Sequence, residues 1–152
     1  MNTNDNTPLK LKLNMDVLWT ILYERKKREQ PFGRNNKVRV ACGIEPAHPF
    51  FGKNLASKSK SNKKIIFDKR LYDALIQCMK NFNHIPQEPP TKIDDDYFGT
   101  CAEDDAANQL LGKEALIGLN DILFSLAIDP ITFRRVDYCA VCCNVFGLNN
   151  NV

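Results

Sequence analysis

Three cysteines and one glutamate in the second half of the chain have the types and spacing of a metal centre. Cys101 lies two residues before Glu103, and Cys139 and Cys142 follow as a Cys-x-x-Cys pair. Three thiolates can hold a zinc ion and leave its fourth position to water. Bound zinc lowers the pKa of that water toward about 7, and a neighbouring carboxylate such as Glu103 can carry its proton. The spacing predicts a zinc centre suited to hydrolytic removal of a leaving group such as ammonia.

Both motifs are expected at the starts of helices. Residues 101–112 predict one helix, and a short helix is expected from the thiol pair to residue 146. At a helix start, backbone N–H groups favour the thiolate form of cysteine. Asp104 and Asp105 are expected to interact with the dipole of the first of these helices. Cys143 is an alternative ligand next to the pair, but the i,i+3 spacing favours Cys139 with Cys142.

The periodicity of the remaining residues predicts an α/β fold with a mixed central sheet and helices on both faces. The apolar run 122–128 is typical of a central strand that is covered on both faces. Residues 43–54 predict an ordered loop, and residues 84–97 a long irregular approach to the metal motifs. The other elements expected are a helix over 14–29, a helix over 68–81, and strands over 38–42, 65–67 and 132–138.

The two early helices carry different signals. Asp68 is expected to cap the second helix, whose buried stripe is Leu71, Leu75, Cys78 and Met79. Asn14 is expected to cap the first helix, and the residues that recur at helical spacing in it are Met15, Leu18, Trp19 and Leu22. Residues 1–13 are expected to form a flexible tail, and residues 14–152 a single domain.

Basic residues gather in the first half of the chain. Residues 1–80 hold 17 Lys and Arg against 7 Asp and Glu, a net +10, whereas residues 81–152 hold 4 against 11, a net −7. A basic half suits a polyanion such as nucleic acid, although a solvated lysine-rich surface explains it equally well. The four lysines at 58, 60, 63 and 64 are either phosphate contacts or a solvated loop tip.

The composition limits the class of protein. With 152 residues, 43% of them hydrophobic, the chain can build a single core. We see no apolar run long enough to span a membrane, and the polar segment 1–6 does not resemble a signal peptide. Six cysteines could form disulfides in a secreted protein, but the spacing of the last four favours metal binding in a reducing compartment.

The pairing of Cys101-Ala102-Glu103 with Cys139-Ala140-Val141-Cys142 resembles the zinc-dependent cytidine deaminase-like superfamily. The order of elements is also similar: two early strands, the Cys-Ala-Glu helix, a hydrophobic strand and then the Cys-x-x-Cys segment. Within that superfamily the chain looks most like the bacterial polymorphic-toxin nucleic-acid deaminase domains, which are compact and often end soon after the thiol pair. Tyr138 departs from the pattern, because a proline commonly precedes the first thiol.

The resemblance implies a compact cytidine deaminase-like fold in which Cys101, Cys139 and Cys142 bind Zn²⁺ and Glu103 is the general acid and base. The implied reaction is deamination of a nucleobase, with cytosine in single-stranded DNA as the first choice. RNA and free nucleosides or nucleotides are alternative substrates. A toxin domain would act in the cytoplasm of a cell, delivered as a secreted effector, and would require a cognate immunity protein.

Four further residues are candidate substrate contacts: Asn36, Tyr97, Phe98 and Thr100. The two aromatic residues can stack on a base or belong to the core. Asn36 can bind a sugar or a base edge, or simply form a turn.

Two rival interpretations are not enzymatic deamination. A zinc-stabilised binding module without catalysis would need a fourth protein ligand, for which Cys42, His84 or Cys143 could serve. A redox dithiol is the weaker rival, because no thioredoxin-like strand and helix pattern precedes the pair.

Overall fold

A computed structural model describes residues 7–28, 38–42, 50–53, 65–130 and 132–150. Within these ranges, side chains are described for residues 8–23, 50–52, 65–130 and 132–150. Asn36, Cys42 as a side chain, and the lysine tract 56–64 therefore lie outside what is described. No helix in the described ranges is both long and apolar enough to cross a membrane.

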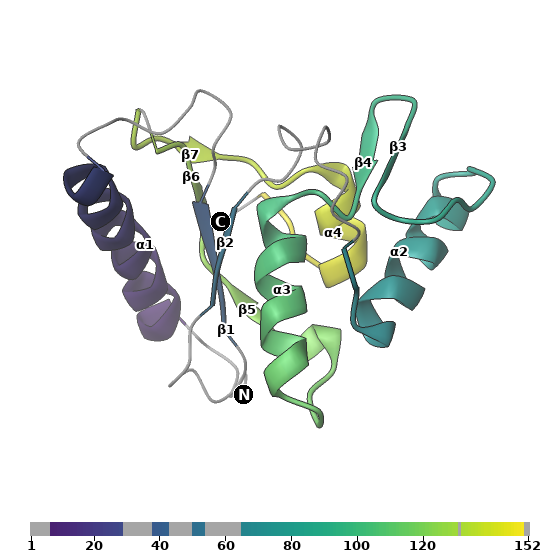
Figure 1. The fold of residues 1–152 in the computed structure, drawn as a ribbon, viewed down its shortest axis with the longest axis horizontal. Helices are drawn as coiled ribbons and strands as arrows, with labels where there is room; N and C mark the ends of the chain where they lie inside the picture. The colour runs from purple at the N-terminus through teal and green to yellow at the C-terminus, as the bar shows by residue number, and fades with distance from the viewer. Residues whose placement is uncertain (1–6, 29–37, 43–49, 54–64, 131, 151–152) are drawn as a thin grey trace.

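An antiparallel sheet occupies the middle of the molecule (Figure 1). Its strand order is β2-β1-β6-β7, and β5 also pairs with β1. Every pairing among the described strands of this sheet is antiparallel, so the prediction of a mixed sheet is wrong for this part of the chain. The strands are β1 (Val38–Cys42), β2 (Phe50–Lys53), β5 (Leu123–Phe124), β6 (Ala127–Ile128) and β7 (Arg135–Val136).

Helices cover both faces of the sheet, as the α/β interpretation predicts (Figure 1). Helix α1 (Thr7–Arg28) packs on one face through Leu13, Val17 and Ile21, against Ile128. Helix α3 (Ala102–Lys113) lies on the other face, with α2 (Lys69–Asn81) and α4 (Ala140–Phe146) beyond it. Since these three helices share the larger core cluster, α3 and α4 are held together next to the sheet.

The central strand is interrupted by a β-bulge. Ala41 pairs with Phe124 but Val38 pairs with Ile128, so one extra residue lies between β5 and β6. The bulge leaves backbone groups outside the ladder. The Leu126 N–H donates to Asn14 Oδ1 at 2.8 Å. The predicted strand 122–128 is therefore present in two pieces.

Asn14 consequently does not cap α1, and that prediction is wrong. The helix begins at Thr7, and Asn14 serves from within it as an acceptor for the bulge. Residues 7–13 are helical where a flexible tail is expected, and Leu13 is buried at 2% exposure.

The four residues that recur at helical spacing in the sequence lie largely on the exposed side of α1. Met15, Trp19 and Leu22 are 52%, 65% and 48% exposed, while the buried positions are Leu13, Val17 and Ile21. Leu18 is half-buried at the edge of the α1 cluster. Apolar residues occur on both sides of this helix, so periodicity alone does not identify which side faces the sheet.

Helices α2 and α3 agree with their predictions. Asp68 caps α2 by accepting from the Arg70 N–H at 3.0 Å. The buried residues of α2 are the four expected ones, Leu71, Leu75, Cys78 and Met79. Helix α3 lies where residues 101–112 predict it, and Ala102, Ala106, Leu110 and Leu111 are among its buried residues.

The second strand of the sheet is not where the pattern placed it. Residues 50–53 form β2, although a loop is expected there, whereas residues 65–67 are not a strand. Phe50 and Phe51 pack into the two opposite core clusters, which is the alternation of a strand. A Cβ on Gly52 would lie 1.9 Å from the carbonyl oxygen of Ala102, so only glycine permits β2 to approach α3 this closely.

The approach to the metal motifs is more regular than expected. Strands β3 (Thr91–Ile93) and β4 (Asp96–Phe98) form a separate antiparallel hairpin, which occupies the second half of the predicted irregular segment 84–97 and ends one residue beyond it. His84 lies against this hairpin, with Nε2 3.3 Å from Asp96 Oδ2 and its ring edge-on to Phe98.

The predicted strand 132–138 is reduced to two residues, since Phe133 has a positive φ of 58°.

Candidate metal centre

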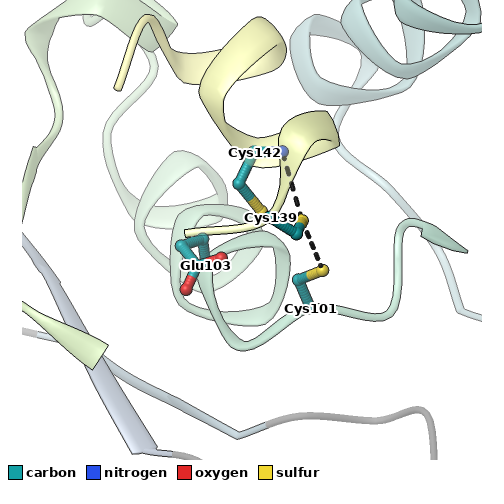
Figure 2. A group of neighbouring side chains, drawn as sticks. All are labelled: Cys101, Glu103, Cys139 and Cys142. Carbon is teal, nitrogen blue, oxygen red and sulfur yellow. Dashed lines mark hydrogen bonds between the residues drawn. The ribbon is translucent and has the colours of Figure 1, made fainter. Parts of the chain in front are cut away.

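The three predicted sulfur ligands and Glu103 converge at one place. One ligand atom from each of Cys101, Glu103, Cys139 and Cys142 lies within 4.8 Å of the others. Figure 2 shows the first two on α3 and the thiol pair at the beginning of α4. Among the described residues no other group of metal-ligating side chains gathers in this way.

Two helix starts produce this convergence. Cys101 is the N-cap of α3 and Cys139 the N-cap of α4, and both have extended backbone conformations. Cys139 Sγ accepts from the Cys142 N–H at 3.4 Å, which turns both thiols of the pair to one side. Helix α4 is held in place by Phe146, whose ring centroid lies 4.7 Å from that of Phe124 on the central strand. The sheet therefore supports the position of the thiol pair.

The donor set and its spacing fit a zinc ion. The Sγ atoms of Cys101 and Cys139 are 3.3 Å apart. Two thiolates in tetrahedral coordination at a zinc–sulfur distance of about 2.3 Å would be about 3.8 Å apart. A small opening of the sulfurs would accommodate the ion, and sulfur with one carboxylate is a set that zinc accepts.

Burial is uneven across the centre. Glu103 and Cys142 have no exposed surface, while Cys101 and Cys139 are half-buried. Access from solvent is therefore on the side of Cys101 and Cys139. A carboxylate buried against three sulfurs is in a position to exchange a proton with a molecule that reaches them from that side.

In the metal-free protein Cys101 and Cys142 hold their protons at neutral pH. The hydrogen bond with Cys139, followed by burial, raises the pKa of Cys101 above its ordinary value, although a contact with Cys142 opposes this. Burial, and then hydrogen bonds with the other two thiols, raises the pKa of Cys142. A metal ion must displace these protons in order to bind.

Asp104 has a more specific role than a dipole partner. It is completely buried, and its Oδ2 accepts from the Cys101 N–H at 3.2 Å. This is the reciprocal contact of a capping box, with aspartate at the third helical position. It fixes the backbone of the first thiol ligand.

The remaining candidate substrate residues lie near one another in the chain but in different environments. Tyr97 is 40% exposed, with the Lys92 amine 5.2 Å from its ring centroid. Phe98 is fully buried and packs edge-on to Phe82. Of its two predicted roles, stacking on a base or belonging to the core, the structure shows the second. Thr100 is half-buried, and its Oγ1 has no hydrogen-bond partner in the described ranges. Asn36 is outside those ranges.

Two residues considered as a fourth ligand are not in the described cluster. His84 contacts Asp94 and Asp96 on the hairpin, and Cys143 Sγ is 4.0 Å from the Tyr138 carbonyl oxygen. Neither belongs to the group of converging ligand atoms. Cys78, behind the centre, has a pKa raised to about 12, mainly by burial, and so stays a thiol at neutral pH.

Sequence reasoning missed two residues that hold the thiol-pair loop. Tyr138 donates its hydroxyl to the Ser125 carbonyl oxygen at 2.8 Å, and the Asn150 side chain contacts the Tyr138 backbone. In the sequence, Tyr138 is marked only by its departure from the pattern of the superfamily that the two motifs resemble. Asn150 lies in an asparagine-rich end with no periodicity, so the sequence offers no signal for it.

Comparison of the chain with protein-family models, with curated proteins and with solved structures finds no match in any of the three.

Proposed function

We propose that this protein is a zinc-dependent deaminase that converts cytosine to uracil in single-stranded DNA. One observation carries the proposal: three thiols and a fully buried glutamate converge within 4.8 Å of one another. Three sulfurs leave one zinc position to water, and the buried carboxylate beside them supplies the acid and base group that hydrolysis requires.

The residues of the chain divide the work between holding the metal and moving a proton. Cys101, Cys139 and Cys142 would hold the zinc ion, which when bound makes a nucleophile from water available at neutral pH. Glu103 would take a proton from water and deliver it to the ring nitrogen N3 of cytosine. The water oxygen bonds to C4, the C4–N bond breaks, and the second proton of the water leaves with the amino group as ammonia, so cytosine and water give uracil and ammonia.

The arrangement of elements supports a compact cytidine deaminase-like fold. Strands β1 and β2 precede the Cys-Ala-Glu helix α3, and the central strand of β5 and β6 precedes the Cys-x-x-Cys helix α4. This is the order on which the resemblance rests. The two motif helices also share one core cluster on the same face of the sheet.

Single-stranded DNA is the favoured substrate for an energetic reason. A base that is already exposed avoids the unstacking cost of a few kcal/mol that a duplex imposes. Tyr97 offers an exposed ring four residues before the ligand Cys101, and Thr100 directly precedes that ligand. Delivery as an interbacterial toxin, with an immunity protein as partner, remains a proposal that rests on the family resemblance alone.

A closed structural zinc site is the second candidate, and one observation favours it. The Glu103 carboxylate lies close enough to the three sulfurs to act as a fourth ligand. In that case no position would remain for water, and the protein would be a zinc-stabilised binding module.

The substrate experiment uses the zinc-loaded protein with single-stranded DNA, duplex DNA, RNA and free cytidine. Products are read by sequencing for C-to-T changes and by chromatography for uridine. We expect conversion of single-stranded DNA that weakens as salt rises, because phosphate contacts are screened. Conversion of cytidine alone, insensitive to salt, would identify a nucleoside enzyme instead. If the zinc-loaded protein converts none of these substrates, the deaminase proposal is wrong and the zinc-stabilised binding module is the better interpretation.

A further inference from the structure

Tyr138, the residue directly before the ligand Cys139, is held at three points. Its hydroxyl donates to the Ser125 carbonyl oxygen at 2.8 Å, in the β-bulge of the central strand. Its backbone N–H donates to Asn150 Oδ1 at 2.8 Å. Its carbonyl oxygen accepts from Asn150 Nδ2 at 3.1 Å.

The two contacts from Asn150 form an amide clamp on one residue of backbone. A side-chain amide that accepts from an N–H and donates to a C=O offers the pairing that a neighbouring strand would offer. Asn150 is itself anchored, because Arg135 Nη2 donates to its carbonyl oxygen at 3.0 Å. The clamp therefore connects the thiol-pair loop to strand β7, and the Tyr138 hydroxyl connects the same loop to the bulge.

This clamp matters because of the residue it holds. A proline before the first thiol would fix its own φ and carry no N–H. The φ of Tyr138 is not fixed by a ring, its N–H requires an acceptor, and the residue is only 5% exposed. The clamp supplies an acceptor for the Tyr138 N–H. It also restrains the Tyr138 backbone, as the ring of a proline would.

The first ligand is secured in a comparable way. Asp104 Oδ2 accepts from the Cys101 N–H at 3.2 Å, so a side chain fixes the backbone at the start of α3. Asn150 fixes the backbone of Tyr138, one residue before the N-cap of α4. The 3.3 Å approach of the Cys101 and Cys139 sulfurs depends on both turns keeping their orientation.

We infer that Asn150 is a positioning residue, which orients Cys139 toward the metal by clamping the backbone of Tyr138. This rests on the proposed metal centre and adds to it a residue about 50 positions beyond the first ligand. Asn150 does not touch the metal or the substrate and acts only through Tyr138. Its loss would leave the thiol in the chain but misdirected.

The test measures cobalt binding to the reduced, metal-free full chain, because thiolate–cobalt absorption reports coordination by sulfur. Asn150→Ala removes both contacts, and Asn150→Asp keeps an acceptor for the Tyr138 N–H but loses the donor. Asn144→Ala is the matched control, since Asn144 is an exposed asparagine whose side chain bonds only to Asn81 in the described contacts. Thermal melts of the metal-free variants measure folding separately.

We expect cobalt affinity to fall about tenfold or more in Asn150→Ala, the size of effect usual for residues that orient a ligand. Asn150→Asp should recover part of this loss, and Asn144→Ala should bind as the unmodified protein does. If Asn150→Ala does not fold, Asn150→Asp carries the same comparison with a smaller expected loss.

The outcomes separate this inference from the metal centre itself. Unmodified protein with thiolate–cobalt bands, together with unchanged affinity in a folded Asn150→Ala, would overturn the positioning role only. Affinity that falls merely in proportion to a lower melting temperature, and equally in Asn150→Asp, would also overturn it. Unmodified protein without thiolate–cobalt bands would overturn the metal centre and this inference together.

Discussion

The Sγ atoms of Cys101 and Cys139 lie 3.3 Å apart, although 38 positions separate the two residues in the chain. They meet because each caps a helix and the two helices share one core cluster. The same packing brings Cys142 and Glu103 to the centre, since each lies within one helical turn of a capping cysteine. The whole centre is thus determined by how α3 and α4 pack.

Exchange of a ligand cysteine should remove the metal, whereas exchange of its neighbour should not. We expect Cys142→Ala to lower zinc well below the roughly one ion per chain of a single site, because only two sulfurs remain. Cys143→Ala is the matched control, since Cys143 is outside the converging group. Elemental analysis of both purified variants decides this. Equal zinc loss in the two variants would mean that the ligand assignment is wrong.

Metal affinity should rise with pH. The pKa values of Cys101 and Cys142 are raised, so below their pKa these thiols are protonated and compete with the metal. Each proton displaced makes affinity up to about tenfold greater per pH unit. Cobalt titrations between about pH 6.5 and 8.5 measure this slope. A flat profile would argue against thiol ligands.

The same shifts bear on the stability of the metal-free chain. A thiol with a pKa raised on folding stabilises the native state while it is protonated, that is, below its ordinary value of 9.0. This contribution is lost as pH rises above 9.0 towards the folded-state value. Denaturant unfolding should therefore give a lower free energy of unfolding at pH 10 than at pH 8 without metal, and zinc should reduce the difference.

Gly52 should be indispensable for the position of α3. A Cβ at this residue would lie 1.9 Å from the Ala102 carbonyl oxygen and 2.8 Å from the Ala106 Cβ, next to the turn that carries Glu103. We expect Gly52→Ala to destabilise the fold by about 3 kcal/mol. Gly112→Ala, with nothing within 4 Å of the new Cβ, should be neutral or stabilising by up to about 1 kcal/mol. Urea unfolding of both variants measures the contrast, and similar values would contradict the close approach of β2 and α3.

The buried face of α1 can be tested by one pair of substitutions. Val17 has no exposed surface, whereas Trp19 is 65% exposed. Val17→Ala should lower the free energy of unfolding by about 2 kcal/mol through the cavity it leaves. Trp19→Ala should change it by no more than about 0.5 kcal/mol. A larger loss for the tryptophan would mean that the helix packs by its other face.

The elements that could be predicted from the sequence are those with strong local signals. Asp68 followed by a clear apolar stripe predicts α2, and the spacing of Cys101, Glu103 and the thiol pair predicts their convergence. The elements that could not be predicted depend on distant contacts. Nothing local indicates that β2 forms beside α3. The close approach is possible only because Gly52 has no side chain, and the helix it contacts begins 50 residues later in the chain.

Hydrogen bonds from polar side chains to backbone groups far away in the chain could not be predicted from the sequence either. Asparagine is a residue type common at helix N-caps, yet the Asn14 side chain accepts a hydrogen bond from Leu126, 112 positions away. Asn150 lies in a run of asparagines and contacts Tyr138 twice. Such residues satisfy backbone groups that a bulge or a loop leaves outside the sheet, and the need arises only in the folded chain.

The most direct test of the proposed deaminase measures zinc and cytosine conversion on the same preparation of Glu103→Gln. The glutamine keeps the shape of the side chain but cannot carry a proton. Glu114→Gln, at the other end of the same helix, is the matched control. We expect Glu103→Gln to retain zinc and to lose conversion of single-stranded DNA by a factor of about 100 or more. Loss of zinc from this variant, or conversion that persists without the carboxylate, would contradict the proposal.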